Sequence, residues 1–384
     1  MPAWQISTYH AHVLALRSLR NLIAESLRLQ WSTLRTDAWL YCLPVNTAVL
    51  AVGLTLHQLR PAVAIVAAAV SVGFGAFHQL TRFRLLPMLI ATLGFSISAW
   101  VGAVVGHINL ACSILVAIIW GAVFGGLTEL GQGAWWIGLQ CVIALFVSSA
   151  YPAQPWPATQ RVLLILLGGA LQIIWTLLLW RWRREPLIAQ KIFEPLNWNL
   201  APTRFFGIPH PLGDAGARYA LRVAAVLAVA VLVEHLSPWS NTYWIPMTAA
   251  IVLKTDFRTT FTRGIARLVG TIIGAALTTA VAALLRPPPV VLAAILLLAL
   301  CGCFSFQKVN YGLFSLFITT YVVLLLSLLG LPAPELALHR TLGTSIGGAL
   351  ALLCFVIVRP AKVSNDEPPT VRDSQPSKAA PLAP

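Results

Sequence analysis

The hydrophobic positions of this chain form long apolar runs that are separated by short polar stretches. Most runs are roughly 17–25 residues long, which is the length that a helix needs to cross a bilayer. The pattern therefore predicts an all-α polytopic membrane protein with about twelve transmembrane helices. We place them at residues 39–56, 61–77, 86–106, 110–127, 134–150, 161–180, 219–234, 241–253, 264–285, 290–304, 312–330 and 339–358. The eighth run is short and contains Pro246, so we expect a kink or partial unwinding there.

Composition excludes a soluble globular protein. Of the 384 residues, 58% are hydrophobic and 10% are charged, whereas soluble domains are about a quarter charged. The mean hydropathy is +0.80. A net charge of +14 could indicate a nucleic-acid partner, but the location of the cations is more informative than their sum in a membrane protein. We expect lipid, and no nucleic acid, around this chain.

The positive charges also predict the topology. If the N-terminus is cytoplasmic, 22 of the 26 Lys and Arg residues lie on the cytoplasmic side. Only Arg60, Arg161, Arg286 and Arg340 lie on the other side. Cytoplasmic loops carry the excess of Lys and Arg in membrane proteins. We therefore expect a protein of the bacterial inner membrane with both termini in the cytoplasm.

The two halves of the chain match each other at a constant offset of 179 residues. The sequence GGAL occurs at 168–171 and again at 347–350, in each case seven residues after an arginine, Arg161 and Arg340. Six helices in each half give both halves the same orientation, which predicts a parallel repeat. The resulting division is a basic leader (1–38), a first repeat (39–180), a cytoplasmic linker (181–217), a second repeat (218–360) and a polar, disordered tail (361–384).

The leader contains one stretch with helical periodicity, residues 12–34, in which basic and apolar positions are mixed. Such a helix could lie on an anionic inner leaflet. It could equally be a solvated helix that packs on the body of the protein.

A cluster of cations at 254–267 is the main candidate for a binding site. Arg263 and Arg267 share one helical stripe with Gly270 and Gly274, at spacings of four, seven and eleven residues. The two glycines allow close helix packing, and a helix N-terminus favours anions. We therefore expect an anion site at the cytoplasmic mouth of the ninth span. The alternative is that the arginines anchor the helix to lipid phosphates. Lys254 and Arg258 complete the cluster, set against Asp256.

A second stripe repeats this arrangement at the other membrane face. Arg340, Gly343 and Gly347 lie on one side of the twelfth span, so cations flank close-packed helices at both mouths. Tyr243 and Trp244 precede the Pro246 break. They are either residues of the interfacial aromatic belt or a surface on which an aromatic substrate stacks.

Few residues are candidates for coupling or chemistry. The acidic residues near the bilayer are Glu129, Glu234, Asp256 and Glu335, and a proton-coupled transporter needs a titratable group in its path. We name Asp256 and Glu129 as coupling candidates. The CGC sequence at 301–303 has no common metal-ligand spacing, and no nucleotide-binding loop, zincin helix or nucleophile elbow occurs. We therefore expect no metal, no cofactor and no enzymatic activity.

Three segments of the second half resemble the fusaric acid resistance family. They are YWIPMTAAIVLKTDFRTTFTRGIARLVGTIIGAAL (243–277), KVNYGLFSLFITTYVVLL (308–325) and HRTLGTSIGGAL (339–350). The resemblance implies a twelve-helix efflux protein of the inner membrane for aromatic or other weak organic acids, driven by the proton gradient. The matching motif residues are Tyr243, Trp244, Thr248, Arg263, Arg267, Gly270, Thr271, Gly274, Asn310, Tyr311, Arg340 and Gly347.

The resemblance also implies partners. These are a small organic acid as substrate and a periplasmic adaptor protein. Apart from the resemblance, we name a homo-oligomer as a candidate assembly. Two other functions fit the same pattern: a passive organic-anion channel, and a membrane scaffold for envelope assembly that transports nothing.

Overall fold

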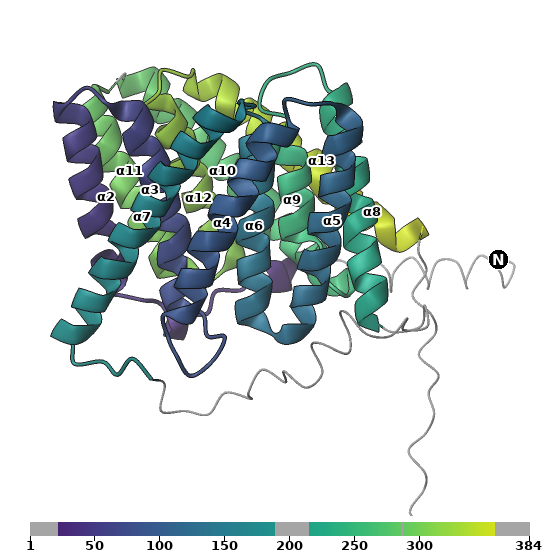
Figure 1. The fold of residues 1–384 in the computed structure, drawn as a ribbon, viewed down its shortest axis with the longest axis horizontal. Helices are drawn as coiled ribbons and strands as arrows, with labels where there is room; N and C mark the ends of the chain where they lie inside the picture. The colour runs from purple at the N-terminus through teal and green to yellow at the C-terminus, as the bar shows by residue number, and fades with distance from the viewer. Residues whose placement is uncertain (1–21, 189–214, 286, 358–384) are drawn as a thin grey trace, which may run out of the picture.

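The fold is a bundle of helices that run roughly parallel to one another (Figure 1). The computed structural model describes residues 22–188, 215–285 and 287–357, so most of the predicted leader, linker and tail lie outside the described residues. The helices are α2 (Ala38–Thr55), α3 (Leu59–Gly73), α4 (Leu86–Val105), α5 (Leu110–Leu127), α6 (Gln132–Ser149), α7 (Pro155–Trp182), α8 (Ala215–Leu236), α9 (Trp244–Val252), α10 (Phe257–Leu285), α11 (Pro289–Phe306), α12 (Tyr311–Ser327) and α13 (Ala333–Ile357), with short 3₁₀ helices η1 (Trp31–Thr33), η2 (Phe74–Phe77) and η3 (Thr128–Leu130).

The prediction of an all-α polytopic membrane protein is confirmed. Within the described ranges, ten helices are long and apolar enough to cross a membrane. Helix α12 is also apolar but has 17 residues, at the lower limit of the spanning length, whereas α9 has nine and falls well short of it. The predicted eighth span at 241–253 is wrong, because a nine-residue helix measures only about 14 Å, less than half of a bilayer core. The chain leaves helical geometry at 237–243, where Asn241 adopts a left-handed φ of 60°.

Two predicted helix starts are also wrong, with consequences for the candidate residues. Helix α10 begins at Phe257 and α13 at Ala333, about two turns before the predicted starts at 264 and 339. Arg267 is therefore about 15 Å along α10, and Arg340 about 10 Å along α13, at 1.5 Å per residue. Neither arginine lies in a terminal turn.

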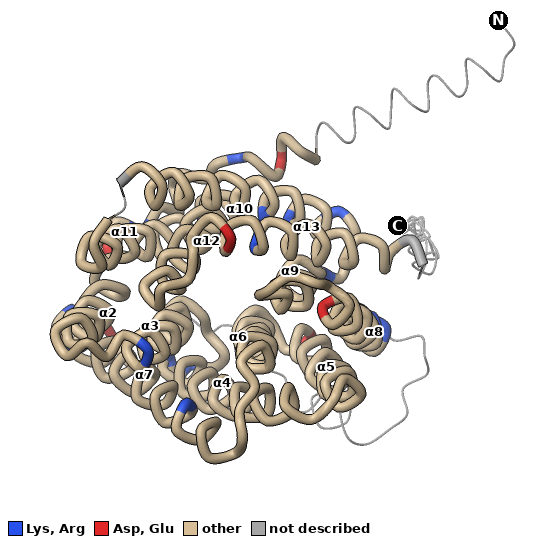
Figure 2. Tube along the Cα trace, turned by 90° about the horizontal axis from the view of Figure 1, so that it is seen from above, with Lys and Arg blue, Asp and Glu red and all other residues tan. Residues whose placement is uncertain are grey.

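The helices of the two halves correspond at the predicted offset. Adding 179 to the bounds of α5 gives 289–306, which are the bounds of α11. Helix α4 packs on α6 as α10 packs on α12, and α3 packs on α7 as α9 packs on α13. The halves meet at two seams, where α5 packs on α8 and α11 packs on α2 (Figure 2). This arrangement is what a parallel repeat requires.

Charged groups gather at the end of the bundle where α7 ends and α8 begins, which we call the linker face. Ion pairs there join Arg84 to Glu185 at 2.8 Å and Arg183 to Asp37 at 2.6 Å. The opposite end, which we call the far face, includes residues 150–154 and 237–243. Exposed side chains along the helices are largely apolar, as a lipid-facing surface requires.

The described part of the leader packs on the body of the protein. Residues 22–26 are helical, and the chain then runs across the linker face. The Gln30 amide donates to the Val309 carbonyl at 2.9 Å, and the Asn310 side chain donates to the Ser26 carbonyl at 3.1 Å. Of the two predicted arrangements, these residues adopt the one in contact with the protein.

We expect Gly270→Ala to lower thermal stability, because the added Cβ would overlap the Gly312 carbonyl oxygen of α12. Overpacking of this kind typically costs about 1–3 kcal/mol. The control is Gly348→Ala on α13, where no atom lies within 4 Å of an added Cβ. Melting of the detergent-purified variants measures the difference, and equal melting temperatures would contradict the close packing of α10 on α12.

Candidate functional site

The interior of the second half contains two buried arginines. Arg267 of α10 has 3% of its surface exposed, and Arg340 of α13 has 2%. Both belong to helices that pack on α12. Cations at such depth are rare in membrane proteins and are usually functional, because burying them is costly.

Each guanidinium group is only partly satisfied by the protein. Nη1 of Arg267 donates to the Tyr311 hydroxyl at 3.2 Å, whereas its Nε has no hydrogen-bond partner. Nε of Arg340 donates to Thr319 Oγ1 at 3.1 Å, whereas its Nη1 has no partner. The Arg340 guanidinium carbon lies 4.2 Å from the centre of the Trp244 ring. The two arginines therefore keep free donors in a buried site.

Hydroxyl groups connect the two arginines. Thr319 Oγ1 lies 3.5 Å from Thr271 Oγ1, which lies 3.3 Å from Ser315 Oγ. Ser315 Oγ in turn donates to the carbonyl oxygen of Arg267 at 3.0 Å. The polar groups thus form one continuous cluster between α10, α12 and α13, which we call the arginine cluster.

The predicted glycine stripes bring these helices together. An added Cβ at Gly270 or Gly274 would overlap carbonyl oxygens of α12, and one at Gly343 or Gly347 would overlap α9. Without side chains at these positions, the helix backbones approach closely. The side chains of the arginine cluster are fixed by this contact.

More unpartnered donors surround Arg340. Trp244 and Thr248 lie one turn apart on α9, at the points where Gly343 and Gly347 of α13 make contact. Thr344 follows Arg340 by one turn. Nε1 of Trp244, Oγ1 of Thr248 and Oγ1 of Thr344 are all buried without a hydrogen-bond partner. Each such group costs about 1–3 kcal/mol, so a polar ligand here would be stabilised.

A second pair of cations lies between the arginine cluster and the linker face. Nε of Arg263 donates to the Ile251 carbonyl at 2.9 Å, and its guanidinium carbon lies 4.0 Å from the centre of the Tyr311 ring. Nζ of Lys254 lies 3.4 Å from the centre of the Trp135 ring of α6. Burial, and then the charge of Arg263, lower the pKa of Lys254 to about 6. Arg263 therefore extends the cationic surface toward the linker face, and Lys254 adds to it when the pH falls below about 6.

Among the residues that the structure describes, no carboxylate neutralises the arginine cluster. The ion pairs within residues 22–188, 215–285 and 287–357 involve other groups, and neither Arg267 nor Arg340 belongs to one. Two like charges in a medium of low dielectric also repel each other. The arrangement therefore favours an anion that enters from outside the chain.

Two predicted anion-binding residues lie away from the cluster. Arg258 is exposed and pairs with Glu25 at 2.6 Å. The Asn310 side chain caps α12 by accepting from the Gly312 amide at 2.6 Å. Each has a structural partner, so neither joins the site.

The other predicted anion-binding residues lie in or beside the cluster. Thr271 belongs to it, and Tyr243 is buried with its ring centre 4.4 Å from that of Trp244. Ser315 and Thr319 were not predicted, although with Tyr311 they occur every four residues on α12.

The coupling candidates lie at helix ends on the linker face. Asp256 caps α10, since its Oδ1 accepts from the Thr259 amide at 2.8 Å. Glu129 lies in η3, beside Gly216 at the start of α8. Neither contacts the arginine cluster. No group of three potential metal ligands occurs in the part of the chain that the structure describes.

Comparison with known proteins confirms the predicted resemblance. Residues 224–354, from α8 to α13, match the family model described as fusaric acid resistance protein-like. The chain is 32% identical over 169 residues to the uncharacterized protein slr1298 of Synechocystis, covering 44% of this chain and 21% of that protein. It is 32% identical over 136 residues to the inner membrane protein YccS of Escherichia coli, covering 35% of this chain and 18% of YccS.

These matches cover about a fifth of the length of the two curated relatives. No solved structure matches the chain. The family model covers the half of the chain that contains the arginine cluster.

We expect Arg340→Met to leave the stability of the empty protein unchanged or to raise it. The lost hydrogen bond and cation–π contact contribute about 2 kcal/mol each, but removal of a buried charge recovers several kcal/mol of desolvation. The control is Arg183→Met, which removes an ion pair to Asp37. Melting of the two variants in detergent tests this, and a larger loss for Arg340→Met would indicate a structural role.

We expect the amine of Lys254 to gain its proton only as the pH falls through about 6. Reductive ¹³C-methylation followed by NMR titration measures this value, and Lys254→Arg assigns the resonance. Arg263→Gln should raise the pKa, because it removes a like charge. A Lys254 resonance that titrates near the ordinary value of about 10.4 would contradict the burial of this amine.

Proposed function

We propose that this chain, whose second half matches the fusaric acid resistance family, is a secondary transporter that exports anions of aromatic or other weak organic acids. The observation that carries the proposal is the pair of buried guanidinium groups, Arg267 and Arg340, without a carboxylate partner. The anion would lie in the arginine cluster, near the middle of the bilayer. We base the proposal of transport on this site and not on the relatives of the chain.

Charge compensation is the first argument. Burying one unpaired ion costs several kcal/mol even after relaxation, and the free donors of Arg267 and Arg340 are available to a ligand. A carboxylate accepts strong hydrogen bonds from guanidinium groups. An anion that binds here would therefore offset a cost that the empty protein carries.

The aromatic rings are the second argument. Trp244 lies against Arg340, and Tyr311 lies between Arg263 and Arg267. Offset or edge-on contacts between rings stabilise by about 0.5–1.5 kcal/mol. Rings beside the guanidinium groups favour an anion that is itself aromatic.

The direction of transport follows from the predicted topology. The positive-inside pattern places the linker face in the cytoplasm, and the name of YccS supports an inner-membrane location. Arg263 would then meet anions from the cytoplasm. We propose the proton gradient as the energy source; a periplasmic adaptor and a homo-oligomer stay predictions.

Uptake into inverted membrane vesicles tests the proposal. Radiolabelled benzoate, salicylate and phthalate are offered with and without a pH gradient, and vesicles without the protein give the background. We expect Arg267→Gln and Arg340→Gln to lower transport about 10–100-fold, since a charged hydrogen bond contributes about 1.5–3 kcal/mol.

The matched control is Arg161→Gln, at the position equivalent to Arg340 in the first half. Arg161 donates to the Tyr151 carbonyl at 2.8 Å near the far face, so we expect normal uptake. Immunoblots correct for the amount of each variant. Uptake that follows the anion gradient and ignores the pH gradient would support the passive channel. No uptake above background by the unaltered protein would contradict transport of these acids.

A further inference from the structure

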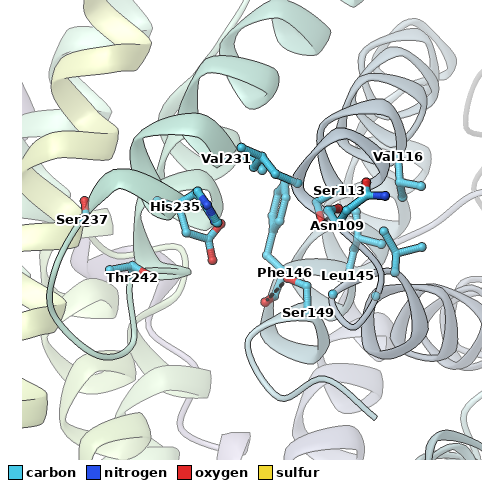
Figure 3. A pocket seen from close by; sticks show the side chains of 15 residues that line it. Asn109, Ser113, Val116, Leu145, Phe146, Ser149, Val231, His235, Ser237 and Thr242 are labelled. Atoms are coloured by element: carbon cyan, nitrogen blue, oxygen red, sulfur yellow. Dashed lines mark hydrogen bonds between the residues drawn. The ribbon is translucent and has the colours of Figure 1, made fainter. Parts of the chain in front are cut away.

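A cavity of about 380 Å³ lies toward the far face, at the seam between the two halves (Figure 3). The first half contributes α4, α5 and α6, and the second half contributes the end of α8 and the segment before α9. Its volume falls in the range of small-molecule sites, about 300–1,000 Å³. The lining residues are Gly102, Val105, Gly106, Asn109, Leu110, Ser113, Val116, Leu145, Phe146, Ser149, Val231, Glu234, His235, Ser237 and Thr242.

This cavity, which we call the seam pocket, lies apart from the arginine cluster. None of its lining residues belongs to that cluster. Thr242 connects the two sites along the chain. Tyr243 follows it, and the centre of the Tyr243 ring lies 4.4 Å from that of Trp244, which contacts Arg340. The seam pocket is therefore a separate site.

One carboxylate, that of Glu234, lines the seam pocket. Among the seven acidic side chains that the structure describes, Glu234 is the one without a hydrogen bond or ion pair. The others are engaged as follows: Glu25 with Arg258, Asp37 with Arg183, Glu185 with Arg84, Glu335 with Ser240, Asp256 with the Thr259 amide, and Glu129 in a contact of its own. Glu234 is half-buried.

The rest of the lining supplies no cation to pair with Glu234. His235 is the other titratable side chain of the seam pocket, and no Lys or Arg lines it. Asn109, Ser113 and Ser149 provide hydrogen-bond acceptors and donors on the side of the first half. A half-buried carboxylate in such surroundings lacks a counter-charge.

The titratable groups around the carboxylate come from several helices. His235 follows it on α8, and Tyr243 and Tyr151 lie beyond Thr242 with ring centres 6.2 Å apart. Helix α13, which packs on α8, contributes His339 and Arg340. Arg340 is engaged with Thr319 and Trp244.

Apolar side chains form part of the wall of the seam pocket, beside its polar groups. Leu110, Leu145, Phe146 and Val231 face it, with the Phe146 ring directed across the space between the two halves (Figure 3). An inorganic cation prefers several oxygen ligands at about 2.3–2.6 Å. Glu234 is the one carboxylate among the lining residues, and no group of three His, Cys, Asp or Glu side chains that could hold a metal ion occurs among the described residues. The chemistry fits a cation that carries an apolar body.

We propose that the seam pocket binds a small organic ammonium ion. Its nitrogen donates to the Glu234 carboxylate, and its hydrocarbon part lies against Phe146 and Leu145. An aromatic body fits particularly well, because a ring can pack on the Phe146 ring. This site does not depend on anion export by the arginine cluster.

Calorimetric titration of the full-length protein in detergent with benzylamine tests the proposal. Benzyl alcohol is the matched neutral ligand, since it has the same ring without the charge. We expect benzylamine to bind at pH 7.5 at least tenfold more tightly than benzyl alcohol. We expect Glu234→Gln to remove this preference while keeping the weak binding of the alcohol.

His235→Gln is the matched control variant, because it alters the neighbouring side chain of the same pocket. It should keep benzylamine binding within about twofold. Phe146→Ala should weaken both ligands alike. Equal binding of the two ligands, or a preference for benzylamine that survives in Glu234→Gln, would overturn the proposal. So would competition by sodium ions at millimolar concentration, which would indicate an inorganic cation site.

Discussion

The burial of two guanidinium groups without a counter-charge is the constraint on which the rest of the interior depends. Arg267 donates to the Tyr311 hydroxyl, and Arg340 donates to the Thr319 hydroxyl and lies over the Trp244 ring. These partners satisfy part of the hydrogen-bonding capacity of the two arginines. A carboxylate from the chain would satisfy the remainder and stabilise the protein, but it would also fill the site permanently. Neutral partners hold the cations in place while leaving their charge available to a ligand.

The helix packing around this site also holds the two arginines in place. Glycines bring the backbone of α10 against α12 and that of α13 against α9. The space between these helices is therefore filled by the side chains that lie between the glycine contacts. Helix α9 is buried along its whole length, from Trp244 to Val252. Its ends therefore lie inside the protein. Short helices whose ends lie at membrane depth are typical of transporter binding sites, and here the Ile251 carbonyl at one end receives Arg263.

The sequence predicted most of the apolar spans and the glycine stripes, but it did not predict that α9 is too short to span or how deep the arginines lie. Helices α10 and α13 begin about two turns before their apolar runs, because their first turns contain polar residues that hydropathy assigns to loops. Proline residues indicate such early helix starts, because proline favours the first turn of a helix. Pro155 begins α7, and Pro332 immediately precedes Ala333, where α13 begins. The contact of Lys254 with Trp135 joins residues from different halves, and no local pattern contains it.

The difference between the two halves explains why the pseudo-symmetric bundle has one arginine cluster. In the first half, the position equivalent to Arg267 is Met88, which is fully buried and apolar. The equivalent of Arg340 is Arg161, whose guanidinium reaches the Tyr151 carbonyl near the far face. A second cluster of like charge in the same low-dielectric bundle would add repulsion to the cost of burial. The first half therefore supplies packing, the Trp135 ring beside Lys254 and one wall of the seam pocket. Among the described residues, the fully buried arginines lie in the second half.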